Sequence, residues 1–178
     1  MEKLDIESVR WGLVLALLSI LMGVYLGIHF GKSEDDIKSY LKVKAAASTH
    51  FADDEAKIEN AVADGWKYLK RSHEHFQGLG AISIGLMFVI AGSWLKPLFK
   101  TLLSIGVGLG GYIYPLFWYL VAYSVPEVGK HAAKESLAFM AQFGAGLFTV
   151  SFFCVFLVVL LYAIFRDDLP SFVEPLRE

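Results

Sequence analysis

Two histidines, His73 and His75, lie where a charged stretch of the sequence passes into an apolar one. Imidazole is the commonest side-chain ligand for transition metals and also binds haem iron, and helix bundles assemble such sites from facing helices. His73 continues a series of apolar positions spaced three or four residues apart, namely Ile58, Val62, Trp66, Leu69 and Phe76. This spacing predicts a helix face turned towards a core, so His73 is the first candidate for a buried ligand.

A haem bound by two histidines needs imidazoles from two helices. His73 and His75 cannot hold one ion together, because side chains two positions apart point about 200° away from each other around a helix. We therefore expect a b-type haem to pair His73 with His29 or His131. A non-haem transition metal would draw on the other polar groups nearby, which are His75, Glu74 and Glu135.

The alternative is that these histidines bind no cofactor. All five fall on one side of the membrane in the topology described below, but that side also carries most of the residues outside the spans. An imidazole has an apolar body and a polar tip, which suits a membrane interface without any ligand. Both interpretations remain open from the sequence.

Four apolar runs must position these side chains. Crossing the hydrocarbon core takes about 20 residues of helix, and backbone polar groups in lipid have to be paired within the segment. The runs cover residues 11–30, 76–95, 101–125 and 137–165. We predict an all-α integral membrane protein, a single domain over residues 1–178 with four transmembrane helices in an antiparallel bundle.

Residues 32–75 form the one long segment outside these spans. Acidic clusters alternate with lysines there, and no proline interrupts the sequence between residues 53 and 95. We expect one long helix over that range, with Asp53 or Asp54 capping its start. The segment would be largely helical, and the second helix would extend beyond the membrane.

Small residues predict how the helices pack. Gly23, Gly27 and Gly31 recur every fourth residue and give a smooth face on which another helix can lie closely.

Pro115 cannot donate a hydrogen bond to the carbonyl of Gly111, so we predict a kink there. Aromatic residues gather around it, which favours either plain packing or a cavity for a quinone or lipid: Tyr112, Tyr114, Phe117, Trp118, Tyr119 and Tyr123. Pro126 is expected to open a separate amphipathic segment.

Four spans put both termini on one face. Short segments near the termini and around residues 96–100 carry lysine and arginine, which favours a cytoplasmic location for that face. A literal count of Lys and Arg favours the opposite orientation, because segments 32–75 and 126–136 contain more of them. We expect cytoplasmic termini, with residues 32–75 on the outer face.

Composition excludes several classes of function. A net charge of −2 gives no electrostatic footprint for nucleic acid, and the single cysteine, Cys154, rules out an internal disulfide. No charged residue lies in the middle of a span, which argues against an ion-coupled transporter. The histidines also lack the spacing of the HExxH metalloprotease motif.

The function predicted from these features is that of a small integral membrane subunit of a redox or respiratory-type complex. It would hold haem b or a transition metal at one membrane face, and it would transfer electrons or be non-catalytic rather than act as a stand-alone enzyme. The alternative is an accessory or scaffolding subunit without a cofactor. Its partners would be the lipid bilayer and other membrane-complex subunits, or a second copy bound through glycine-rich helix faces.

Overall fold

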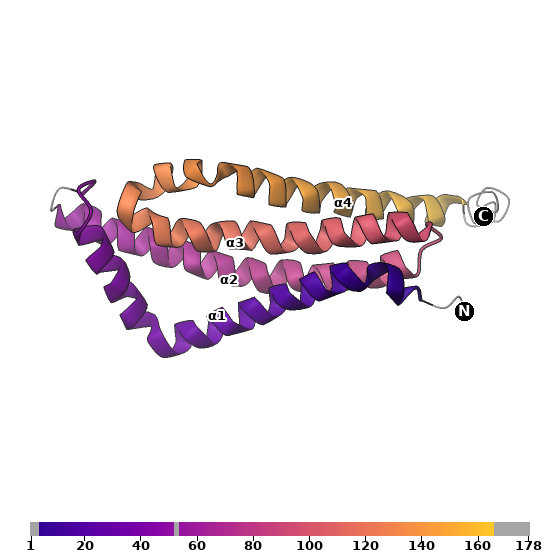
Figure 1. Ribbon diagram of the computed structural model, residues 1–178, viewed down its shortest axis with the longest axis horizontal. Helices are drawn as coiled ribbons and strands as arrows, with labels where there is room; N and C mark the ends of the chain where they lie inside the picture. Colours follow the sequence, from indigo (N-terminus) through magenta and orange to yellow (C-terminus); the bar gives the residue numbers. More distant parts are fainter. Residues whose placement is uncertain (1–3, 52–53, 166–178) are drawn as a thin grey trace.

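The computed structural model describes residues 4–51 and 54–165, and this part of the chain is all-helical. Each of its helices is long and apolar enough to cross a membrane, which confirms the all-α class and the count of four candidate spans. The helices are α1 (Ile6–Ala46), α2 (Glu55–Ala91), α3 (Pro97–Ser136) and α4 (Ala138–Phe165). Figure 1 shows them lying along the long axis of the molecule, with the start of α1 and the end of α4 at the same end.

Helix α1 runs well past the predicted end of the first span at Phe30. It begins after Asp5, whose carboxylate accepts a hydrogen bond from the backbone N–H of Ser8 at 3.2 Å. Its backbone leaves the helical conformation at Ser33 (φ −136°, ψ 28°), and the chain bends there before continuing to Ala46. Figure 1 shows the second half of α1 turning back towards α2 beyond this bend.

Helix α2 matches the expected long helix within a few residues at each end. Asp54 caps its start by accepting a hydrogen bond from the N–H of Lys57 at 3.2 Å, whereas Asp53 lies outside the described residues. The helix ends at Ala91, four residues before the predicted Leu95. The turn to α3 therefore begins at Gly92 rather than at Lys96.

Helix α3 contains both Pro115 and Pro126 and continues through each of them. Non-helical backbone falls instead at Gly129, with φ 78° and ψ 163°. The predicted amphipathic segment is thus the end of α3, and its break lies three residues after Pro126. The carbonyl of Gly111, which Pro115 leaves without an N–H partner, lies 3.4 Å from the hydroxyl of Ser19.

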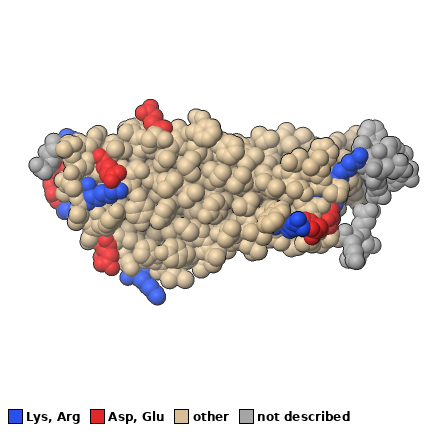
Figure 2. Space-filling view, viewed as in Figure 1, with Lys and Arg blue, Asp and Glu red and all other residues tan. Residues whose placement is uncertain are grey.

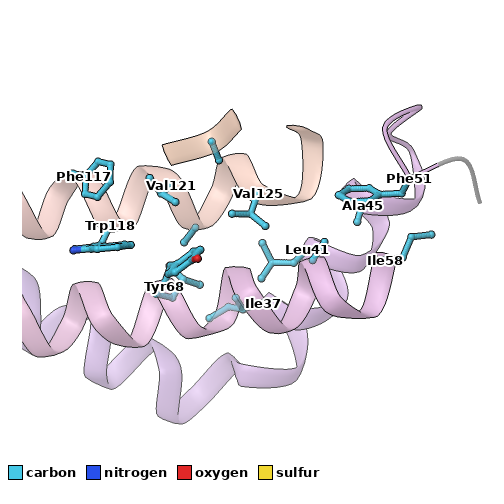
Figure 3. Close-up of a cluster of buried hydrophobic side chains, with 14 residues drawn as sticks. Ile37, Leu41, Ala45, Phe51, Ile58, Tyr68, Phe117, Trp118, Val121 and Val125 are labelled. Carbon is cyan, nitrogen blue, oxygen red and sulfur yellow. The ribbon is translucent and has the colours of Figure 1, made fainter. Parts of the chain in front are cut away.

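The described chain has a hydrophobic core at each end. We call the wider end the head, formed by the second half of α1, the first half of α2 and the end of α3. Leu41 and Val125 are almost completely buried in its core (Figure 3). Leu69 of α2 is fully buried in the same core. The core at the other end is smaller and includes Val9, Met87, Ile90, Val107 and Val155.

Close glycine contacts join the helices in and beside the smaller core. A β-carbon on Gly108 would lie 2.7 Å from the carbonyl oxygen of Gly12, so α1 and α3 nearly touch there. A β-carbon on Gly110 would lie 2.5 Å from the backbone nitrogen of Phe148 in α4. Such approaches need residues without side chains.

Charged residues are distributed as a membrane protein requires. Figure 2 shows lysine, arginine, aspartate and glutamate gathered towards the two ends, with none across the middle of the face in view. Large apolar side chains stay exposed along the helices between those ends, among them Leu21, Phe88, Val150 and Phe153. An exposed apolar surface of this kind suits lipid contact.

Candidate functional site

His73 lies between α1 and α2 and is half-buried. Its Nδ1 atom is 2.8 Å from the carbonyl oxygen of Gly23. A β-carbon on Gly27 would come within 2.8 Å of its Cε1 atom, so Gly27 makes room for the ring. Phe30 packs against the imidazole edge to face, with 5.8 Å between the ring centroids. Two of the three glycines in the predicted row, Gly23 and Gly27, therefore pack against a residue of the same chain.

The bond to Gly23 determines the tautomer of a neutral His73. A carbonyl oxygen only accepts, so Nδ1 carries the proton and Nε2 keeps its lone pair. Metal-binding histidines usually make such a bond with the nitrogen that does not bind the metal, because it orients the ring and raises its basicity. His73 thus has the supporting bond expected of a ligand.

The other candidate ligands lie against different neighbours. His75 packs on the ring of Tyr114 in α3, with centroids 5.2 Å apart, and Glu74 is exposed. His29 stacks on Tyr25 at 6.0 Å. His131 and Glu135 are exposed on the final turns of α3.

The pairing of His73 with a second histidine around a haem stays a prediction, whereas a metal site built from several side chains can be searched for directly. Within residues 4–51 and 54–165, no group of three or more His, Cys, Asp and Glu side chains is placed to hold a metal ion. The ring of His73 packs against Gly23, Gly27 and Phe30 of α1. The fold therefore offers one imidazole with the supporting hydrogen bond of a ligand, and the identity of a second ligand stays a prediction.

A cavity at the bend of α1 was not anticipated from the sequence. We call it the tyrosine cavity; it is a hollow of about 510 Å³ that is widely open to the surface, between the bend at Ser33 and α3. Its wall includes His29, Asp36, Tyr40, Tyr119 and Tyr123. The aromatic cluster predicted around Pro115 supplied two of these tyrosines. The residues that α1 supplies to the cavity wall are brought there by the bend at Ser33, and no proline in the sequence indicates this bend.

The remaining aromatic residues after Pro115 serve packing. Trp118 and Phe117 are in the head core, and Trp118 lies 5.2 Å from Tyr68 between ring centroids. The guanidinium of Arg71 sits 4.4 Å from the Trp118 ring, and the ammonium of Lys134 sits 4.8 Å from the Tyr68 ring. Cations over aromatic faces stabilise this region by about 0.5–1 kcal/mol each where they are exposed.

Polar groups also form contacts between helices at the end of the molecule away from the head. Lys100, in the first turn of α3, is buried, and its ammonium donates to the carbonyl oxygen of Ala91 at 3.2 Å. It lies 3.5 Å from the carboxylate of Asp5. The hydrogen bond from Ser8 is the main cause that lowers the pKa of Asp5, and Lys100 contributes to the same shift. These contacts hold the ends of α1, α2 and α3 together and have no catalytic geometry.

The fold defines a class, an all-helical chain with four candidate membrane spans and a packed head. Comparison with protein families, with curated proteins and with solved structures found no match to the chain.

Proposed function

We propose that the chain is a small accessory subunit of a larger membrane complex, which anchors its head at one membrane face. The four helices would cross as an antiparallel bundle, with α2 extending beyond the membrane. The length of α2 supports this arrangement, since 37 residues at 1.5 Å each span about 55 Å against about 30 Å of hydrocarbon. The excess corresponds to the part of α2 that lies in the head.

The observation that carries this proposal is the packed core of the head. Leu41 and Leu69 are fully buried, and Val125 is 1 % exposed, so segments from three helices are fixed against each other. A surface that is already ordered loses less conformational entropy when a partner binds. The head is thus suited to present a rigid surface to another protein.

Within the membrane, part of the glycine-rich surface remains open for a partner helix. Gly78 and Gly85 on α2 are exposed, and a β-carbon on either meets no atom within 4 Å. Ala81 lies between them and is exposed as well. Small residues at this spacing allow a second helix to pack closely against α2 in lipid. We propose that the face formed by Gly78, Ala81 and Gly85 contacts another subunit or a second copy of the chain.

Native gel electrophoresis in a mild detergent tests the proposal. The wild-type chain should migrate as part of a larger complex, and replacing Gly78 and Gly85 together by leucine should release the monomer. Gly146→Leu is the matched control, because Gly146 on α4 is equally exposed and free of contacts. A complex of unchanged size in the double variant would refute the contact, and a monomeric wild-type chain would refute the accessory role.

The redox role remains a second candidate because of the bond between His73 and Gly23. Haem b or a transition metal would supply one-electron chemistry, with Nε2 of His73 as a ligand and His29 or His131 as the second. Natively purified protein should then show a reduced-minus-oxidised haem band, or a stoichiometric metal by elemental analysis. Loss of this signal in His73→Ala would support the assignment, and its absence from the wild-type protein would end it.

Cytoplasmic termini with the head on the outer face form the proposed orientation. Cysteine labelling in intact cells with a membrane-impermeant maleimide distinguishes the two faces. Lys57→Cys in the head should react, whereas Glu7→Cys near the start of α1 should react only after the membrane is opened. The reverse pattern would invert the topology.

A further inference from the structure

The tyrosine cavity has the composition of a site for an organic cation. Tyr40 comes from α1 beyond the bend, and Tyr119 and Tyr123 come from α3. The three rings form one cluster, with centroids 6.2 Å apart for Tyr40 and Tyr123 and 5.1 Å apart for Tyr119 and Tyr123. The bend at Ser33 brings the two helices into this arrangement, since Ser33 itself is part of the wall.

A carboxylate completes the wall. Asp36 lines the cavity, and among the described residues it has no ion pair, nor does any lysine or arginine line the cavity with it. Lys44 reaches the backbone of Tyr123, but its ammonium donates to that carbonyl at 2.8 Å and lies 3.0 Å from the carboxylate of Glu127. The ammonium of Lys44 is therefore engaged by other groups of the chain.

Aromatic rings beside a carboxylate favour one chemical class of ligand. The π-face of a phenol attracts a cation, and clusters of such rings recognise quaternary ammonium groups. We propose that the tyrosine cavity binds the ammonium head of a ligand, with the rings around its alkyl groups and Asp36 opposite its charge. The cavity lies just beyond residue 30, where the first predicted span ends, so choline or ethanolamine lipid headgroups and free organic cations can both reach it.

Native mass spectrometry of the full-length chain in a maltoside detergent provides the test. The probes are phosphatidylcholine, phosphatidylglycerol as a lipid without an ammonium group, and tetramethylammonium as a free cation. We expect phosphatidylcholine to bind more tightly than phosphatidylglycerol. Competition by tetramethylammonium would show that the site accepts the free cation, and binding of phosphatidylcholine without such competition would assign it to lipid headgroups.

Two pairs of variants link binding to the proposed contacts. Asp36→Asn should weaken phosphatidylcholine binding about tenfold, which corresponds to about 1.4 kcal/mol. Asp35→Asn is the control, because this exposed neighbouring carboxylate lies outside the cavity, and it should bind phosphatidylcholine as the wild-type chain does. Tyr40→Leu should weaken binding similarly, and Tyr40→Phe, which keeps the aromatic face, should retain it. Equal affinity for the two lipids, or equal binding by Asp36→Asn and Asp35→Asn, would overturn the proposal.

Discussion

The Nδ1 atom of His73 lies 2.8 Å from the carbonyl oxygen of Gly23, and this hydrogen bond joins α2 to α1 across a glycine face. The ring fits because Gly27, one turn further along α1, has no side chain. The position of His73 thus depends on two glycines of the row that the sequence predicts as a packing surface.

Gly27→Ala should destabilise the protein because the added carbon would lie 2.8 Å from Cε1 of His73. The ring cannot move away without weakening its bond to Gly23, so we expect a loss of about 1–3 kcal/mol in the free energy of unfolding. Gly31→Ala is the control, because its β-carbon meets nothing within 4 Å. Thermal unfolding in detergent measures both. An equal melting temperature for the two variants would contradict the role of Gly27.

Gly110→Ala should loosen α4 from α3. Its β-carbon would lie 2.5 Å from the backbone nitrogen of Phe148, and a backbone contact of this kind is relieved only by moving one helix. We expect a loss of about 1–3 kcal/mol from this overpacking. Gly146→Ala adds the same carbon to α4 in open space and should not lower the unfolding temperature, since alanine favours a helix over glycine. If Gly110→Ala is as stable as this control, the close approach of α3 and α4 is wrong.

The four helices could be predicted from the sequence because each apolar run matches the thickness of a bilayer. The bend at Ser33 was not predicted: Gly31 and Ser33 weaken the helix there, but they do not determine in which direction the chain turns. Beyond the bend, Ile37, Leu41 and Ala45 are buried in the head core. Packing across three helices therefore decides the course of α1 beyond the bend, and such contacts are invisible in a local pattern.

For the histidines, too, the local sequence predicted the face of the helix but not the residues packed against it. Helical spacing placed His73 and His75 on different faces, and in the structure they contact α1 and α3 respectively. The spacing could not show which imidazoles from other helices would lie beside His73. That depends on the rotation of each helix about its axis, which is determined by contacts such as those of Gly23 and Gly27.

Gly129→Ala should strain the end of α3 for two separable reasons. The backbone angles of Gly129 (φ 78°, ψ 163°) lie in a region almost confined to glycine, and a residue with a β-carbon is strained there by about 1–3 kcal/mol. The new carbon would also lie 2.7 Å from Nε2 of His50. Adding His50→Ala should remove the second effect and restore only part of the stability, which urea unfolding can resolve. Full restoration would show that the backbone conformation itself carries no strain.

Acid should weaken the end of the bundle where Asp5 caps α1. The hydrogen bond from Ser8, with a contribution from Lys100, holds the pKa of Asp5 below its ordinary value of 3.8. A carboxylate with a lowered pKa in the folded state stabilises the protein above pH 3.8, and this contribution is lost as the pH falls through the folded value. Melting temperatures between pH 7 and pH 3 should therefore fall more steeply for the wild-type chain than for Asp5→Asn, which lacks the ionisable group and starts less stable. Parallel curves for the two proteins would mean that the contacts of Asp5 with Ser8 and Lys100 contribute nothing to the stability of the bundle.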